Sequence, residues 1–212
     1  MNDHFSDDNF AFWVREYSGL TNAFTPLPAA SVEPVVRRLH QFSCRDVLDL
    51  GCGFGRMALA LAIHGFNVTA IDLIPAAIDF VKEWAAKENV TIATQVCAAE
   101  RLNAIRDYDA VYCNSVLDHM QLASAQVSME NIARALKPGG VAHVAFDGQE
   151  EEDPQTYVVL EDGTFQYTSG KRKGKLWRYF SDHEIRRLCG GLEILEFTTA
   201  GNGKRGVWCR SD

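Results

Sequence analysis

Alternating glycines and an aspartate that follows them are the residues whose types and spacing point most directly to chemistry. Gly51, Gly53 and Gly55 follow one short apolar run, and Asp72 ends a second run, 21 residues after Gly51. Glycines leave the backbone N–H groups of a turn open to a ligand, because no side chain stands in the way. A carboxylate at the end of a neighbouring parallel strand can accept hydrogen bonds from both hydroxyls of a ribose. The pattern predicts a nucleoside-binding site.

A strand, a turn, a helix and a second strand are needed to bring these residues together. The first apolar run predicts a strand over 46–50, the segment after it a helix over 54–64, and the second run a strand over 67–72. Parallel strands joined by a helix end at the same edge of their sheet. The glycine turn and Asp72 are therefore predicted to be neighbours.

The rest of the chain continues this alternation. Further strands are predicted at 90–97, 109–113 and 140–146, and further helices at 75–88 and 122–136, with a short turn around 100–105. Ser181 and Glu184 predict a capped last helix that stops at Gly190, and two final strands follow at 192–199 and 205–210. This order predicts an α/β fold with a doubly wound, mostly parallel sheet.

The glycine spacing also carries a family resemblance. The sequence G-x-G-x-G differs from the G-x-G-x-x-G of dinucleotide-binding proteins. It resembles motif I of the class I S-adenosylmethionine-dependent methyltransferases, in which an acid such as Asp49 precedes the first glycine by two positions. YDAVYCNSVLDHM (108–120) is similar to the family's fourth strand and the loop after it, and LKPGG (136–140) to the turn before the fifth strand. The resemblance covers about 47–144 and implies a single domain over 1–212, with a seven-stranded sheet that ends in an antiparallel hairpin.

The resemblance implies S-adenosyl-L-methionine as the cofactor and S-adenosyl-L-homocysteine as its product. The methionine end of the cofactor would lie over the glycine loop, which assigns to it Asp49, Gly51, Cys52, Gly53 and Gly55.

The nucleoside end of the cofactor is expected at the neighbouring strands. Asp72 matches the ribose-binding acid, and Leu73 could pack on the adenine. Ala98 stands where many relatives carry an aspartate for the adenine amino group, so recognition is expected from backbone groups of Ala98 and Ala99, or from Glu100. Asn114, at the end of the fourth strand, matches a position whose backbone faces the cofactor.

Asp118 and His119, just past the fourth strand, are the candidate catalytic residues. A histidine with a near-neutral pKa can take a proton from an acceptor, and Asp118 could orient it. The alternative is that His119 only shapes the pocket and hydrogen-bonds the backbone. No metal site is expected.

Two segments outside the shared core are expected to select the acceptor. The first, 1–41, is predicted to be a helical cap in which Phe10, Trp13, Val14 and Tyr17 recur at helical spacing. The second, 148–180, is predicted to be a β-hairpin insert over the substrate, with its turn at Asp162-Gly163.

Four aromatic or basic side chains in these segments are candidates for the acceptor pocket: Trp13, Tyr17, Tyr167 and Arg178. The basic run KRKGK (171–175) is either a solvated loop or an anion-binding lid over the substrate.

Composition and charge exclude several classes of function. The net charge of −7 argues against nucleic-acid binding, which needs a positive field. The acidic N-terminus does not resemble a signal peptide, and no apolar stretch approaches the roughly 18 residues of a membrane span. The six cysteines show no C-x-x-C pairing and are expected to be reduced, which favours the cytoplasm. A monomer or homodimer is expected.

Taken with the resemblance, the residues predict methyl transfer to a small molecule whose accepting atom is O, N, S or a metalloid. An oxidoreductase that binds a nicotinamide cofactor is the first alternative, although the glycine spacing and LKPGG argue against it. A module that binds the cofactor without catalysis is the second.

Overall fold

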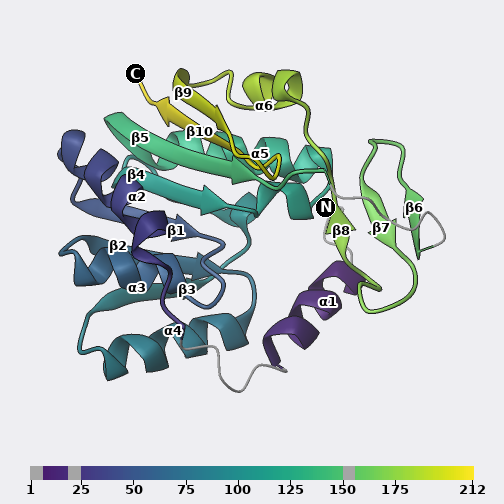
Figure 1. Ribbon diagram of the computed structural model, residues 1–212, viewed down its shortest axis with the longest axis horizontal. Coiled ribbons are helices and arrows are strands. Elements are labelled where there is room, and N and C mark those ends of the chain that lie inside the picture. Colours follow the sequence, from purple (N-terminus) through teal and green to yellow (C-terminus); the bar gives the residue numbers. More distant parts are fainter. Residues whose placement is uncertain (1–6, 19–24, 150–155) are drawn as a thin grey trace.

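A central sheet of seven strands organises the protein. The computed structural model describes residues 7–18, 25–149 and 156–212. In spatial order the strands are β3 (Ile92–Val96), β2 (Asn67–Asp72), β1 (Asp46–Leu50), β4 (Tyr108–Asn114), β5 (Leu136–Phe146), β10 (Arg205–Arg210) and β9 (Glu193–Thr199). The first five are parallel, whereas β10 runs antiparallel to both of its neighbours. The predicted mostly parallel sheet with an antiparallel final hairpin is confirmed (Figure 1).

Helices cover both faces of this sheet and bury two apolar clusters. One cluster combines strand residues with side chains of α2 (Ala29–Gln41), α3 (Arg56–Ile63) and α4 (Pro75–Lys87). The other combines strand residues with side chains of α5 (Leu122–Ala135) and α6 (Asp182–Leu188). Ser181 and Glu184 form the predicted capping box at the start of α6. No helix in the described parts of the chain has the length and apolar character to span a membrane.

The strand order reverses between β1 and β4, and this reversal opens the site. From β1 the chain moves outward through β2 and β3, and then returns to β4 on the other side of β1. The connections that leave the carboxyl ends of β1 and β4 therefore diverge, and ligands of open α/β sheets bind at such a switch point. Two short helical turns, η1 (Ala99–Arg101) and η2 (Leu117–His119), follow β3 and β4 at this edge.

A helix and a small sheet lie beyond the carboxyl ends of the strands. Helix α1 (Asp7–Ser18) lies beside β8 (Leu176–Trp177), which belongs to an antiparallel sheet with β6 (Tyr157–Val159) and β7 (Phe165–Tyr167) (Figure 1). The predicted hairpin forms with its turn at Asp162-Gly163, where Gly163 has φ +84°.

The structure differs from the sequence prediction at the buried face of α1. Phe12 is 5% exposed and forms part of the core, whereas Phe10 is 37% exposed. The periodicity alone placed Phe10 inward, but α1 contacts the protein on two sides, so a second face of the helix is also buried.

The segment LKPGG does not form the separate turn that was predicted. Helix α5 ends at Ala135, and β5 begins at Leu136, which pairs with Tyr108 of β4. The register then shifts so that Val141 pairs with Ala110, which leaves 137–140 bulged out of the ladder. The bulge places Lys137 Nζ 2.7 Å from Asp46 Oδ2 and 2.9 Å from Asp109 Oδ1, and these contacts tie three strand ends together.

Candidate cofactor and acceptor site

A cavity lies at the carboxyl edge of the sheet. It encloses about 780 Å³ between the protein atoms, including the part that opens to solvent. Its walls come from α1, the ends of β1 and β2, the segment after β3, the loop between β4 and α5, and β8. The cavity thus joins the predicted cofactor residues with the predicted catalytic loop.

The glycine loop forms the floor of the cavity at Gly51. Gly51 has φ +70°, and a Cβ there would overlap the side chain of Val116. Gly53 has φ +53°, and a Cβ there would lie 2.8 Å from Tyr17 Oη. Only Gly51 of the predicted loop residues lines the cavity, while Cys52, Gly53 and Gly55 lie behind it. The left-handed backbone and the close neighbours explain why these positions need glycine.

Asp72 holds the glycine loop against the start of α4. Its Oδ2 accepts the Gly53 N–H at 2.9 Å, and its Oδ1 accepts the Ile74 N–H at 2.9 Å. The side chain is 8% exposed and lines the cavity, and burial raises the pKa of its carboxyl group. Each carboxylate oxygen can accept a further hydrogen bond, so a pair of ribose hydroxyls fits this residue.

Asp49 lies beneath the loop and does not line the cavity. Its carboxylate accepts the Ala58 N–H in the first turn of α3, and burial raises its pKa to about 7. Its Oδ2 has no hydrogen-bond partner among the described residues. This acceptor beneath the loop is compatible with a cationic group above it, and the expected contact with an ammonium group stays a prediction.

The segment after β3 forms the wall beyond Asp72. Ala98, Ala99 and Glu100 line the cavity as predicted for an adenine site, and Leu73 lines it from β2. At the end of β4, the sequence assigned Asn114 to the cofactor, but the next residue, Ser115, lines the cavity instead. The chain turns sharply there, since Ser115 has φ +54°.

His119 lies on η2, after β4, and lines the same cavity. Its Nδ1 is 3.4 Å from the carbonyl oxygen of Leu176, and its ring packs edge-on against Trp13 with 5.1 Å between centroids. Burial lowers the pKa of the imidazole, and the nearby charges of Asp118 and Asp147 oppose that shift. The ring is therefore neutral at neutral pH and can accept a proton.

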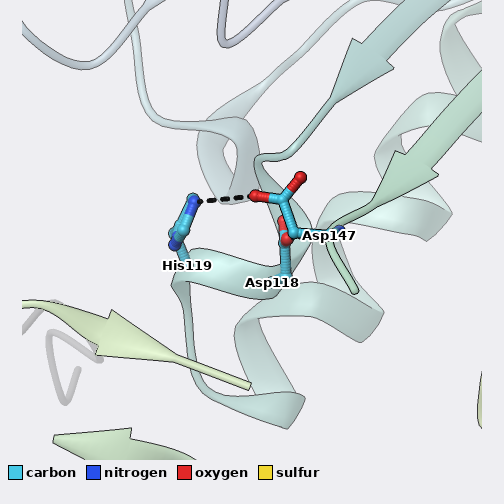
Figure 2. Close-up of side chains that lie close together, drawn as sticks. All are labelled: Asp118, His119 and Asp147. Carbon is cyan, nitrogen blue, oxygen red and sulfur yellow. Dashed lines mark hydrogen bonds and ion pairs between the residues drawn. The ribbon is translucent and has the colours of Figure 1, made fainter. Parts of the chain in front are cut away.

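The carboxylate nearest to the His119 ring belongs to Asp147, not to the predicted Asp118. Asp147 Oδ2 lies 4.0 Å from His119 Nε2 (Figure 2). Burial opposes the ionisation of Asp147, but hydrogen bonds from Ser115 Oγ (2.7 Å) and Lys204 Nζ (3.0 Å) lower its pKa. Sequence reasoning missed this residue, although it directly follows the apolar run of the fifth strand at the same sheet edge.

Asp118 holds the segments around His119 together through hydrogen bonds. Its side chain is fully buried, its Oδ2 accepts the Asp147 N–H at 2.9 Å, and its carbonyl oxygen accepts the Arg178 N–H at 2.7 Å. No hydrogen bond joins Asp118 to the His119 ring among the described residues, but its charge opposes the lowering of the imidazole pKa by burial, so its orienting role stays a prediction.

Asp118, His119 and Asp147 could each offer one atom to a metal ion, since these atoms lie within 4.8 Å of one another. The Lys204 ammonium group already occupies one side of Asp147 at 3.0 Å, and its positive charge opposes a cation there. The expectation of a site without a metal stays a prediction.

Asn9 of α1 joins the elements around His119, and the sequence gave no signal for it. Its Nδ2 donates to the carbonyl oxygen of His119 at 3.1 Å, and its Oδ1 accepts the Leu176 N–H at 3.0 Å. The residue is 5% exposed and lines the cavity. Trp13 and Tyr17 of the same helix also line it, as the sequence predicted.

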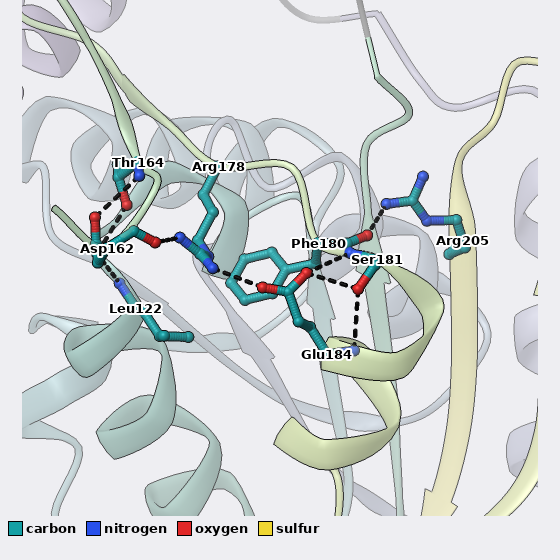
Figure 3. Close-up of polar contacts among 8 residues, drawn as sticks. All are labelled: Leu122, Asp162, Thr164, Arg178, Phe180, Ser181, Glu184 and Arg205. Atoms are coloured by element: carbon teal, nitrogen blue, oxygen red, sulfur yellow. Dashed lines mark hydrogen bonds and ion pairs between the residues drawn. The ribbon is translucent and has the colours of Figure 1, made fainter. Parts of the chain in front are cut away.

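Tyr167 and Arg178, the other predicted pocket residues, do not line the cavity. Tyr167 is 2% exposed and packs against Tyr157, since its face of β7 turns into the small sheet. Arg178 donates to the carbonyl oxygen of Asp162 and pairs with Glu184 at 2.6 Å, which joins the hairpin turn to α6 (Figure 3).

The same hairpin turn supports the loop that carries His119. Asp162 Oδ2 accepts the N–H of Leu122, the first residue of α5, at 2.8 Å (Figure 3). A carboxylate at this position satisfies a free donor of the helix and interacts favourably with its dipole. The insert thus fixes the start of the helix that follows η2.

Comparison with known proteins agrees with this geometry. Residues 47–140 match a family model described as a methyltransferase domain. The ubiquinone biosynthesis O-methyltransferase of Rickettsia bellii is 32% identical over 145 residues, which are 68% of this chain and 60% of that protein. The match therefore spans less than two thirds of the length of this relative.

Solved structures show the same fold. A S-adenosylmethionine-dependent methyltransferase from Clostridium acetobutylicum has a TM-score of 0.70 at 14% identity, over 95% of this chain and 98% of that one. A 1,6-didemethyltoxoflavin-N1-methyltransferase from Burkholderia thailandensis, with S-adenosylhomocysteine bound, has a TM-score of 0.68 at 19% identity, over 98% and 92%. The fold is that of the class I methyltransferases. With the matched domain and the curated relative, the chain belongs to the class I S-adenosylmethionine-dependent methyltransferases.

Proposed function

We propose that this protein transfers a methyl group from S-adenosylmethionine to a hydroxyl oxygen of a small molecule. One observation carries the proposal: Gly51, Asp72 and the imidazole of His119 line one and the same cavity. The glycine loop and Asp72 suit a nucleoside with an amino-acid arm, and His119 suits a group that loses a proton.

S-adenosylmethionine supplies a methyl group on a positively charged sulfur, which is already a good leaving group. The chain therefore has to align the acceptor, exclude water and remove a proton. Asp72 would hold the ribose hydroxyls, and Gly51 would leave room for the methionine end. Trp13, Tyr17 and Leu176 form apolar walls that limit the access of water.

His119 would take the proton from the acceptor hydroxyl on its Nε2. Its neutral form provides the lone pair, and the charge of Asp147 at 4.0 Å would stabilise the imidazolium that forms. The alternative is that His119 only shapes the pocket.

The lining of the cavity favours an uncharged acceptor with an apolar body. No lysine or arginine lines it in the described parts of the chain, and Trp13, Met120 and Leu176 lie near His119 in its wall. The curated relative is named as an O-methyltransferase, which supports oxygen among the O, N, S and metalloid acceptors. The insert at 148–180 would cover the acceptor, since Leu176 of β8 forms part of that wall.

The setting we propose is cytoplasmic, as a monomer or homodimer without a nucleic-acid partner. The six cysteines are free in the structure, which agrees with a reducing compartment.

Turnover of S-adenosylmethionine against a panel of hydroxyl, amine and thiol compounds tests the proposed activity. Formation of S-adenosylhomocysteine with a phenol or alcohol, and its absence with amines and thiols, is the expected result. Cofactor binding without turnover on any acceptor would favour a silent module. Reduction or oxidation of a substrate with NAD would contradict the proposal.

A further inference from the structure

Ser124, in the first turn of α5, has a hydroxyl group to which no hydrogen bond is found within the described chain. The residue as a whole is 4% exposed and lines the cavity. Its Oγ is not among the atoms that are shut off from solvent without a partner, so it is reached from the cavity. A hydroxyl that faces a ligand cavity without a protein partner can bond a polar group of the ligand.

The position of Ser124 is fixed by the face of α5 on which it lies. Ser124, Ser128 and Asn131 are spaced by four and three residues, so they share one face of the helix. Asn131 Nδ2 donates to the carbonyl oxygen of Ala99 at 2.9 Å, which turns this face toward η1. Ser124 lies two turns nearer the start of α5 on the same face, and it lines the cavity together with the segment 97–100.

That wall is short of acceptors for an N–H group. The carbonyl oxygen of Ala98 already accepts the Arg101 N–H at 2.9 Å, and that of Ala99 accepts the Leu102 N–H as well as Asn131. The side chains of Ala98 and Ala99 are methyl groups. Near this wall, the cavity lining offers three side-chain oxygens that can accept such a group: Ser124 Oγ, the Glu100 carboxylate and the Gln121 amide oxygen. Ser124 is the most buried of the three.

The orientation of the cofactor brings its base to this wall. If the ribose lies on Asp72 and the reacting sulfur faces His119, the base extends in the other direction, past β2 toward the segment after β3. We propose that Ser124 Oγ accepts a hydrogen bond from the exocyclic amino group of adenine and so determines specificity for this base. The inference rests on the proposed function, because it uses that placement of the ribose.

A chemical double-mutant cycle tests this contact. Calorimetry would measure the affinities for S-adenosylhomocysteine and for its analogue in which hydrogen replaces the 6-amino group. The wild-type protein should bind the analogue about threefold to tenfold more weakly, as the loss of one neutral hydrogen bond predicts. Ser124→Ala should weaken the binding of S-adenosylhomocysteine by the same factor and bind both ligands equally.

Ser128→Ala is the matched control. Ser128 lies one turn further along the same face, is buried, and does not itself line the cavity. Its hydroxyl donates to the sulfur of Met120 at 3.6 Å. This variant should keep the wild-type ratio of the two affinities. Thermal unfolding of both variants would show whether either loses its fold.

Several results would overturn the inference. One is a Ser124→Ala variant that still prefers S-adenosylhomocysteine by the wild-type factor. A second is a loss of the preference in Glu100→Ala alone, which would assign the contact to Glu100. A third is unchanged cofactor affinity with a raised KM for the acceptor, which would place Ser124 at the other ligand. A wild-type protein that binds neither ligand would instead contradict the proposed function itself.

Discussion

At the scale of single residues, the polar groups of the site come from the ends of neighbouring strands. Asp72 follows β2, Ser115 follows β4 and Asp147 follows β5, while Lys204 reaches the same edge from the turn before β10. Removing each of these polar groups from water costs free energy, and hydrogen bonds or opposite charges must offset that cost. The pairing of Asp147 with Lys204 and Ser115 keeps one negative charge beside His119 at neutral pH.

Asp72→Ala tests the cofactor end. The change removes a hydrogen-bond acceptor for two ribose hydroxyls, and each charged hydrogen bond is worth about 1.5–3 kcal/mol at most. The affinity for S-adenosylhomocysteine should fall at least tenfold in calorimetry. Asp79→Ala, at an exposed aspartate of α4, is the control and should leave the affinity unchanged. Equal affinities in the wild-type protein and Asp72→Ala would show that the ribose lies elsewhere.

His119 and Asp147 are tested by the pH dependence of turnover. A positioned base contributes about 10²–10⁴-fold, so His119→Ala should lose that much in kcat with nearly unchanged cofactor affinity. Because burial lowers the pKa of His119 below 6.5, the acidic limb of kcat/KM should lie below that pH. Asp147→Asn removes a charge that raises this pKa, so the acidic limb should move to lower pH.

The same profiles separate a base from a residue that shapes the pocket. His119→Gln keeps some hydrogen bonding and shape but provides no base near neutral pH. Full activity in His119→Gln, with the acidic limb of the wild-type protein, would show that His119 is structural.

Some of these residues could be found in the sequence and others could not, for a local reason. Gly51 and Asp72 were predictable because each directly follows a strand, and the ends of parallel strands meet at one edge. Asp147 obeys the same rule and was still missed, since Asp118 lies next to His119 in the sequence. Adjacency in the sequence does not place two side chains on one side of a helical turn.

At the scale of elements, α1, η2 and β8 meet at Asn9. These three elements are far apart in the sequence, and no periodicity of apolar residues predicts that one amide side chain bonds to two of them. The sequence predicted the existence of the N-terminal helix and of the hairpin insert. It could not predict their docking, because docking depends on single buried contacts.

Asn9→Ala should loosen this junction. Two neutral hydrogen bonds are lost, each worth about 0.5–1.5 kcal/mol, so α1 and β8 should hold the acceptor end less firmly. We expect kcat to fall by roughly tenfold while the central sheet stays folded. Arg15→Ala is the matched control, since Arg15 makes an exposed hydrogen bond from the same helix to the carbonyl oxygen of Lys173. Unchanged kcat and KM in Asn9→Ala would show that the junction does not affect the reaction.

At the scale of the whole molecule, the ligand joins parts that the chain connects only by loops. The cavity touches the ends of β1 and β2, the segment after β3, the loop before α5, the first turn of α5, and α1 with β8. A ligand bound there contacts both sides of the sheet's switch point at once. Binding to the folded state alone should therefore stabilise the complete protein and not a single element.

Thermal unfolding with added ligand measures this effect. At a concentration of one hundred times its Kd, S-adenosylhomocysteine should raise the free energy of unfolding by about 2.7 kcal/mol, because it binds only the folded state. For a chain of 212 residues this corresponds to a rise in Tm of about 5–11 °C. NAD at the same concentration should give no shift, since Arg56 stands where the dinucleotide fingerprint has its third glycine, which lets helix and strand pack closely beside the pyrophosphate. In Asp72→Ala at the same ligand concentration, a tenfold loss of affinity should reduce this stabilisation to about 1.4 kcal/mol, because it depends on the logarithm of the affinity. A larger shift with NAD than with S-adenosylhomocysteine would contradict the assignment of the cavity to a methyl donor.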